Sequence, residues 1–349
     1  MVTQKSVLVF GAGPAGLSVA REELLRGSRV HLVATYLPNG DSLSGSPPPT
    51  YRFAAGIQQP FGGKDPNDPR LRMYLGSHPE MMRLARDPDC QAVRECELTT
   101  MIDPNQPLPE WASLVDGYRR FNNAEVYTTA AFDPPGLVRY WWEQLLSKFA
   151  DNLTYECRAA NADEHGAIRA QQPPAGFDRM HMCAGYAGFN TILHDGTDFP
   201  ILGVLVHFEG DGETKCWMDE ERPCGTTGRA NEPDCLYVIR RPWYHGDGSF
   251  EPSGRIVLGG TIKAHVAELP EVELNQVVRE IVRRCNERFG ESFSYGRRLS
   301  VTQCCRPGNT NGFTLRVNAD RTYSEIRGQA GMGIVTAYAS GVEIVGRMA

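Results

Sequence analysis

Three glycines near the N-terminus have the spacing of a turn that binds a pyrophosphate. Gly11, Gly13 and Gly16 follow an apolar run at residues 7–10 and precede a helical stretch. In this pattern the first glycine permits a tight turn, the second lets the backbone approach a pyrophosphate, and the third lets helix and strand pack closely. The N–H groups and the dipole at the start of the helix favour the negative charge of the phosphates. The spacing therefore predicts a dinucleotide site.

The acidic residue that usually binds a ribose hydroxyl in such a site is missing. An Asp or Glu is expected about 20 residues after the glycines, but the second apolar run ends at Thr35 without an acid. The Thr35 hydroxyl would give a weaker, uncharged contact. The alternative is a nucleotide fold that has lost its ligand. Three glycines are costly to keep without use, so the pattern favours a bound dinucleotide.

The elements that must position these glycines are a strand, a turn, a helix and a second strand. Further helices are predicted at 71–87, 134–150 and 272–289, and a strand that runs into small residues at 177–188. Strands are also predicted at 201–208, 236–241, 255–263 and 314–317, with a glycine turn at 328–333 and a closing helix from Ile334. Segments typical of a nucleotide-binding domain thus lie at both ends of a strand-rich middle. The sequence therefore predicts two domains that are interleaved along the chain.

The composition is that of a globular protein with an acidic balance. The chain has 349 residues, a formal net charge of −6 and 41% hydrophobic residues, which argues against a nucleic-acid partner. No apolar run reaches the length of a membrane span. Residues 1–6 lead directly into the first strand and the chain ends without a peroxisomal address, so we expect a cytoplasmic protein.

The ten cysteines do not have the spacing of metal ligands. No Cys-x-x-Cys pair and no Cys/His cluster with zinc-ligand spacing is present, so no metal is expected. Most of the cysteines should be buried thiols. Cys216, Cys224 and Cys235 lie in one polar stretch and could pair if the protein were exported, which the missing signal sequence disfavours.

Further segments carry motifs that occur together in one known family. They are Ala-Ala-Gly-Ile-Gln-Gln-Pro-Phe at 54–61, Tyr-Val-Ile at 237–239, Val-Leu-Gly-Gly-Thr-Ile at 257–262, the pair Arg306-Pro307, and the glycine-rich segment 328–333 with the helix after it. In this order they resemble the D-amino-acid oxidase family of FAD-dependent oxidoreductases over essentially the whole chain. The resemblance implies an α/β fold in which a Rossmann-type FAD-binding domain (1–60, 134–198 and 300–349) is interleaved with an antiparallel-sheet substrate domain (61–133 and 199–299).

The resemblance also implies an activity, the oxidation of an amino or imino acid that carries a carboxylate. Hydride would pass from the substrate α-carbon to flavin N5, and O2 would reoxidise the flavin and yield H2O2. Arg306 matches the arginine that binds the substrate carboxylate, a role that suits a planar, permanently charged guanidinium. Tyr237 matches a tyrosine whose hydroxyl touches the same carboxylate, and Gly331 a glycine whose carbonyl accepts from the amine. By residue type alone, Arg306 could be a solvated arginine and Tyr237 a core residue.

The FAD contacts of the family can be carried over residue by residue. They fall at Gly11, Gly13, Pro14, Ala15, Gly16, Thr35, Ala55, Gly56, Ile57, Ala184, Gly185, Gly331, Met332, Gly333, Ile334 and Val335. Sarcosine-oxidase-like relatives attach the flavin through a cysteine, and Cys305 falls where that residue would be. The nearer relatives hold FAD without a bond, so non-covalent FAD is expected and Cys305 is expected to be a packed thiol.

Several positions depart from the family pattern. Phe61 replaces a tyrosine of the pocket wall, Glu325 replaces a histidine, Arg327 replaces a tyrosine, and the strand at 200–204 has lost an arginine. These changes predict a specialised biosynthetic substrate, with Phe61 and Glu325 setting specificity. Alternatively, Glu325 and Arg327 point the same way on an extended segment and pair with each other.

Other functions stay open at this point. One is the oxidation of a secondary or cyclic amine, or its desaturation, as in sarcosine-oxidase-like enzymes. A flavin enzyme that uses a nicotinamide would need a second glycine-rich unit, and the sequence shows only one. A protein of another class would bind FAD without catalysis. The expected partners are a small amine or amino acid and O2, and a homodimer is left open.

Overall fold

The chain forms two units, each built from segments that are distant in sequence. The computed structural model describes residues 4–46, 48–60, 68–185, 188, 192, 196–219, 236–245, 249–261, 263–329 and 333–349. Unit 1 comprises Met1–Arg52, Val138–Phe199 and Pro307–Ala349, and unit 2 comprises Phe53–Leu137 and Pro200–Arg306. Residues 53–60, 134–137 and 300–306, which the sequence assigned to the cofactor domain, lie in unit 2, and residue 199, assigned to the substrate domain, lies in unit 1. The roles assigned to the two parts stay predictions.

Unit 1 is a mainly parallel sheet with helices. Its elements are β1 (Ser6–Phe10), α1 (Pro14–Leu25), β2 (Arg29–Ala34), η1 (Thr50–Phe53, which ends in unit 2), α3 (Pro134–Phe149, which begins in unit 2), β6 (Leu153–Cys157), α4 (Ala162–Ala170), β7 (Arg179–Met182), β14 (Thr314–Val317), β15 (Tyr323–Arg327) and α7 (Ala337–Arg347). The strand order is β14-β15-β7-β1-β2-β6, and only β14 runs antiparallel to its neighbour. This is the predicted Rossmann-type arrangement. The closing helix, predicted from Ile334, begins at Ala337.

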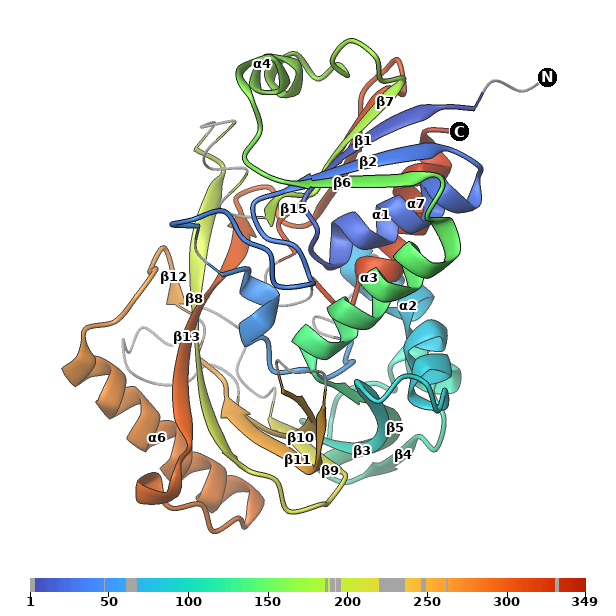
Figure 1. The fold of residues 1–349 in the computed structure, drawn as a ribbon. Helices are drawn as coiled ribbons and strands as arrows, with labels where there is room; N and C mark the ends of the chain where they lie inside the picture. Colours follow the sequence, from blue (N-terminus) through green and yellow to red (C-terminus); the bar gives the residue numbers. More distant parts are fainter. Residues whose placement is uncertain are drawn as a thin grey trace. The chain divides into compact units, whose positions relative to one another are not determined.

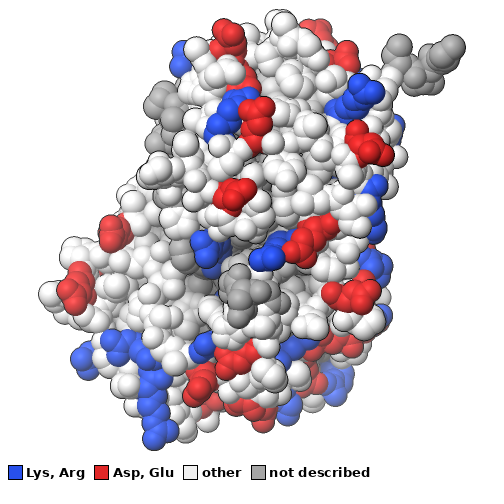
Figure 2. Space-filling view, in the orientation of Figure 1, with Lys and Arg blue, Asp and Glu red and all other residues white. Residues whose placement is uncertain are grey.

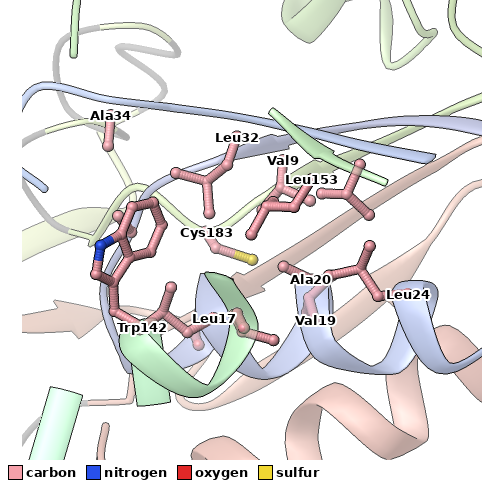
Figure 3. Close-up of a cluster of buried hydrophobic side chains, with 14 of the residues drawn as sticks. Val9, Leu17, Val19, Ala20, Leu24, Leu32, Ala34, Trp142, Leu153 and Cys183 are labelled. Carbon is pink, nitrogen blue, oxygen red and sulfur yellow. The ribbon is translucent and has the colours of Figure 1, made fainter. Parts of the chain in front are cut away.

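The helices α1, α3 and α7 lie along one face of this sheet (Figure 1). The side chains of α1 and of Trp142 from α3 meet Leu32 of β2 and Leu153 of β6 in a buried apolar cluster (Figure 3). All of β1 except its first residue is buried. A continuous apolar strand such as β1 is typical of a parallel sheet that is covered on both faces.

A buried polar network ties α1 to the C-terminal end of the chain. The Glu23 carboxylate accepts a hydrogen bond from Ser28 Oγ (2.7 Å) and contacts Arg179 Nη1 (3.1 Å) and His181 Nε2 (3.2 Å). Arg179 also donates to the carbonyl oxygen of Met348. Burial raises the pKa of Glu23, but the hydrogen bonds from His181 and Ser28 and the charge interactions with His181 and Arg179 outweigh burial and lower it to about 2.

This network predicts a loss of stability in acid. Because the Glu23 pKa is about 2 in the fold and 4.5 as its ordinary value, its contribution is full above pH 4.5 and declines as the pH falls toward 2. Glu23→Gln should lower the free energy of unfolding at neutral pH by about 3 kcal/mol and flatten its decline between those pH values. Urea unfolding as a function of pH measures both effects. The exposed Glu143→Gln variant is the control, and parallel pH curves for wild type and Glu23→Gln would contradict the expectation.

Unit 2 is built on a large, mainly antiparallel sheet. Its elements are α2 (Pro69–Ala85), β3 (Val93–Met101), η2 (Glu110–Leu114), β4 (Arg119–Phe121), β5 (Ala124–Phe132), β8 (Asp198–Glu209, which begins in unit 1), β9 (Lys215–Asp219), β10 (Leu236–Tyr244), β11 (Phe250–Gly259), β12 (Lys263–Ala264), α6 (Glu271–Phe289), η3 (Tyr295–Arg297) and β13 (Ser300–Asn309, which ends in unit 1). The strand order is β12-β8-β11-β10-β9-β3-β5-β4, and β13 pairs with β8. The predicted strand at 255–263 is divided here between β11 and β12.

One face of this sheet is covered by α6. The apolar stripe of the helix, which includes Val277, Ile281 and Cys285, packs on alternate residues of the strands, among them Val206 and Val238. Since successive side chains of a strand point to opposite faces, the other face of these strands carries a different set of residues. That second face carries Tyr237 and Arg306, the two side chains that the sequence predicts to bind a carboxylate.

The surface carries charges of both signs. Arg, Lys, Asp and Glu side chains are interspersed over most of the face in Figure 2. Within the part of the chain that the structure describes, no three or more His, Cys, Asp or Glu side chains form a group that could hold a metal ion. Likewise, none of the helices described is long and apolar enough to cross a membrane.

Candidate functional site

The glycine turn of unit 1 lies where the carboxyl ends of three parallel strands converge. The Gly11 N–H donates to the carbonyl of Val33 at the end of β2, and Cys183 N–H, just after β7, donates to the carbonyl of Phe10 at the end of β1 (both 2.8 Å). Gly11 has a φ of +102°, and an added Cβ would lie 2.8 Å from the carbonyl carbon of Cys183. A Cβ on Gly16 would lie 2.9 Å from the carbonyl carbon of Gly11. The protein's own packing therefore requires both glycines.

Gly13 is different, because nothing in the described structure requires a glycine there. Its φ of −79° and ψ of −178° are extended backbone that any residue adopts. The nearest atom to an added Cβ would be Tyr51 Cδ1, at 3.9 Å. Gly13 is the N-cap of α1, which has no side-chain cap and has Pro14 in its first turn. The N–H groups of Ala15 and of the residue after it therefore lack acceptors within the helix. A glycine beside uncapped N–H groups fits a pyrophosphate that approaches the backbone closely.

The other predicted cofactor residues of unit 1 lie in several places. Thr35 is exposed at the end of β2, and its carbonyl accepts from Leu43 N–H. Ala184 and Gly185 are half-buried after β7, on the same edge of the sheet as Gly11. Gly333 is half-buried, and Ile334 and Val335 are buried, in the turn before α7. Gly331 and Met332 lie outside the described residues. In the same turn Gln329 Nε2 donates to Thr336 Oγ1 (3.2 Å).

Three residues near this edge were not singled out from the sequence. Tyr51 lies against Gly13, and the guanidinium of Arg52 stacks on the ring of Tyr36, 5.5 Å from its centre. Burial, together with Tyr36, raises the pKa of Tyr51. Residues 51 and 52 belong to a single 3₁₀ turn, which is too short to show a periodic pattern in the sequence.

The missing acid at Thr35 predicts a weakened nucleotide site that can be strengthened. A carboxylate at this exposed position would accept hydrogen bonds from ribose hydroxyls. We expect Thr35→Glu to lower the Kd for FAD about tenfold, the effect of one charge-assisted hydrogen bond. Quenching of flavin fluorescence on binding to apoprotein measures the Kd. Ser44→Glu, in the exposed loop that follows, controls for added charge, and equal Kd values for Thr35→Glu and wild type would contradict the assignment.

The predicted flavin-contacting segment in unit 2 is fixed against β5. Ile57 forms a bridge with Ala131, and Phe132 N–H donates to the carbonyl of Gly56 (2.8 Å). Gly56 has a φ of +88°, and an added Cβ would lie 2.9 Å from Cδ of Arg241. Ala55 is half-buried. Phe61 lies outside the described residues.

A buried ion pair supports this segment. Arg241 Nη1 donates to Asp133 Oδ1, and both side chains are 1% exposed. The second carboxylate oxygen accepts from Gly136 N–H (3.0 Å) in the first turn of α3. Burial raises the pKa of Asp133 against the opposing charge of Arg241. The pair therefore links β10 to the start of α3, and the side chain of Arg241 lies against Gly56.

Tyr237 and Arg306 lie on the face of the sheet that α6 does not cover. Tyr237 pairs with Gly259, and Gly259 pairs with Leu205, two residues after Gly203 on β8. Directly paired residues share a face, as do residues two apart. The Tyr237 ring lies over Gly259, and the Arg306 guanidinium lies over Gly203. The structure thus brings the two predicted carboxylate-binding side chains to one face of one sheet.

Cys305 lies on the opposite side of β13 from Arg306, because neighbouring residues of a strand alternate. Its thiol donates a hydrogen bond to the carbonyl of Ala267 (3.0 Å). Burial, with Cys304 and Glu268, raises the pKa of the Cys305 thiol. The thiol points away from Arg306 and its pKa is raised. Both observations favour a packed thiol over a covalent link to the flavin.

Glu325 and Arg327 have separate main partners. Glu325 is 3% exposed and accepts a hydrogen bond from the hydroxyl of Tyr323 (3.0 Å). Arg327 pairs with Asp198 and donates to Thr197 Oγ1 (2.8 Å). Its ion pair with Glu325 is longer, with 3.8 Å between Arg327 Nη1 and Glu325 Oε1. These contacts favour a structural role for Glu325, and its role in specificity stays a prediction.

Comparisons with known proteins bear on the fold. No protein-family model matches the chain, and no curated protein is similar to it in sequence. Solved structures match over nearly the whole chain. A glycine oxidase from Geobacillus kaustophilus has a TM-score of 0.65 at 12% identity, with 99% of this chain and 95% of that chain covered. An iminodiacetate oxidase from Chelativorans sp. BNC1 has a TM-score of 0.64 at 14% identity, with 97% and 94% covered.

A third similar structure is L-alpha-glycerophosphate oxidase from Mycoplasma pneumoniae with FAD bound. Its TM-score is 0.60 at 14% identity, with 99% of this chain and 95% of that chain covered. The chain therefore has the D-amino-acid oxidase-like fold of FAD-dependent oxidoreductases, as its motifs predicted. At these identities the likeness concerns the fold.

Proposed function

We propose that this chain is an FAD-dependent oxidase of a small amine or amino acid that carries a carboxylate. The observation that carries the proposal is Gly13, a glycine that neither its backbone angles nor its described neighbours require, beside the uncapped start of α1. The fold is shared with a structure that has FAD bound. Gly11, Gly13 and Gly16 with the first turn of α1 would hold the pyrophosphate.

The substrate side of the proposal rests on unit 2. Arg306 offers a planar fork that binds both oxygens of a carboxylate, and Tyr237 offers a hydroxyl from the same sheet face. Two of the similar structures are named as oxidases of glycine and of iminodiacetate. Bound FAD would accept a hydride from the substrate α-carbon and return its electrons to O2 as H2O2. Gly331 as an acceptor for the substrate amine and the cytoplasmic location remain part of the proposal, and a homodimer stays open.

Because neighbours with this fold differ in substrate, the test must separate the classes. The protein is loaded with FAD, and H2O2 release is measured with glycine, D-alanine, sarcosine, proline and glycerol 3-phosphate. We expect release with at least one carboxylate-bearing amine. Faster H2O2 release with sarcosine or proline than with glycine or D-alanine would indicate that the substrate is a secondary or cyclic amine. Release with glycerol 3-phosphate alone, or failure to bind FAD, would overturn the proposal. Acid precipitation of the loaded protein should leave the flavin in the supernatant.

A further inference from the structure

Two glycines beneath the proposed carboxylate-binding side chains have no backbone reason to be glycine. Neither Gly203 nor Gly259 has a φ in the left-handed region. Gly203 lies inside β8, where glycine lowers stability and leaves no side chain to pack, and Gly259 is the last residue of β11. Many other glycines of the chain do have positive φ values. The atoms that an added Cβ would meet offer a reason for glycine at 203 and 259.

The atoms above these glycines belong to the two side chains that the proposed function uses. An added Cβ on Gly203 would lie 2.8 Å from Cζ and 3.0 Å from Nε of Arg306. An added Cβ on Gly259 would lie 2.6 Å from Cε2 of Tyr237. Contacts this short are repulsive, so either the side chain or the strand beneath it would have to shift.

We propose that Gly203 and Gly259 are positioning residues, which set the height of the Arg306 guanidinium and of the Tyr237 hydroxyl above the sheet for a carboxylate. The inference rests on the proposed function, which gives the carboxylate to these two side chains. A binding group must be held within about 0.5 Å of its productive geometry. The space that a Cβ would fill is larger than this tolerance, so a methyl group at either position displaces the group above it.

Strand packing alone offers a competing explanation for one of the pairs. An aromatic ring that covers a glycine on the neighbouring strand stabilises a sheet without any ligand. In that case Tyr237 would protect Gly259, and its hydroxyl would have no further role. The Arg306–Gly203 pair has no aromatic ring and falls outside this explanation, so it is the sharper case to test.

The test is a double-mutant cycle on the FAD-loaded protein, with acetate and benzoate as probes and calorimetry as the readout. We expect Gly203→Ala to weaken probe binding about tenfold or more when Arg306 is present, since a displaced fork loses one of two charge-assisted bonds. In the Arg306→Lys background the same change should cost less than about twofold, because a flexible point charge can avoid the methyl group. Equal costs in both backgrounds, or no cost in either, would overturn the inference.

Further variants keep the test decisive. Gly296→Ala is the matched control, since Gly296 has no positive φ and an added Cβ would have only Ser294 Oγ nearby, at 3.9 Å. If Gly203→Ala fails to fold, Gly259→Ala is examined in wild-type and Tyr237→Phe backgrounds, and its cost should largely vanish in the second. If Arg306→Ala does not weaken probe binding, the proposed function and this inference both fail. If it does and the glycine variants do not, the inference alone fails.

Discussion

Gly13→Val protein should fold and be isolated without colour. The valine side chain would stand where the pyrophosphate approaches, whereas the protein itself has space for it, since the nearest atom to the Cβ is 3.9 Å away. The N-cap change costs the helix about 1 kcal/mol, which a protein of this size tolerates. We expect the Kd for FAD to rise by at least about 100-fold, or about 2.7 kcal/mol. Visible absorbance of the purified protein and titration of apoprotein with FAD measure the loss.

The choice of Gly13 makes this result interpretable. Gly11→Val or Gly16→Val would collide with backbone atoms, so loss of flavin in those variants would not separate binding from folding. Gly166→Val is the matched control, because Gly166 is an exposed glycine of unit 1 with no atom within 4 Å of an added Cβ. If purified Gly13→Val protein contains as much flavin as wild type, the assignment of a dinucleotide site to this turn is wrong. Equal loss in Gly166→Val would attribute the effect to folding.

Arg306→Ala should raise KM for the substrate by two or more orders of magnitude while the flavin content stays unchanged. A bidentate charged contact in a half-buried site is worth about 3 kcal/mol, and alanine supplies none of it. Arg306→Lys should recover only part of the loss, because a point charge cannot reproduce the planar fork. Steady-state kinetics with flavin content measured on the same samples separates binding from cofactor loss.

The control for this prediction is another arginine of unit 2. Arg119 is exposed and pairs with Glu97 on the surface (2.6 Å), so Arg119→Ala should leave KM within about twofold of wild type, as expected for a surface ion pair. Near-normal kinetics in Arg306→Ala would remove the carboxylate-binding role from Arg306.

The parts of the fold that were predicted are those with local signals. The glycine turn lies within six residues, and the strand before it and the helix after it have clear apolar patterns. The helix α6 was predicted to within one residue at its start, because its apolar stripe repeats at helical spacing. The strand β14 was predicted with its observed bounds.

The strands that were missed have weaker patterns. β3 reads Val-Arg-Glu-Cys-Glu-Leu-Thr-Thr-Met, and its alternation is obscured by buried or half-buried Thr, Cys and Glu. β5 is buried at nearly every position, so it shows no alternation at all. β13 consists mainly of polar residues that are half-buried by their neighbours. In each case pairing with other strands, rather than local propensity, decides the structure.

The candidate site residues were proposed from motif order, and their roles stay predictions. Motif order indicated Arg306 and Tyr237, whereas the glycines beneath them depend on the register of strands far apart in sequence. The opposite orientation of Cys305 follows from alternation along β13, a strand that the sequence pattern did not indicate. The additional, shorter ion pair of Arg327 with Asp198 could not have been predicted, because 129 residues separate the two partners.

The central claim, oxidation of a carboxylate-bearing amine by bound FAD, is tested most directly by an anaerobic titration. FAD-loaded protein is mixed with each amine in the absence of O2, the visible flavin absorbance is followed, and O2 is then admitted. We predict that at least one carboxylate-bearing amine bleaches the absorbance, and that O2 restores it with about one H2O2 per flavin. An absorbance that no such amine bleaches, or that only glycerol 3-phosphate bleaches, would contradict the account.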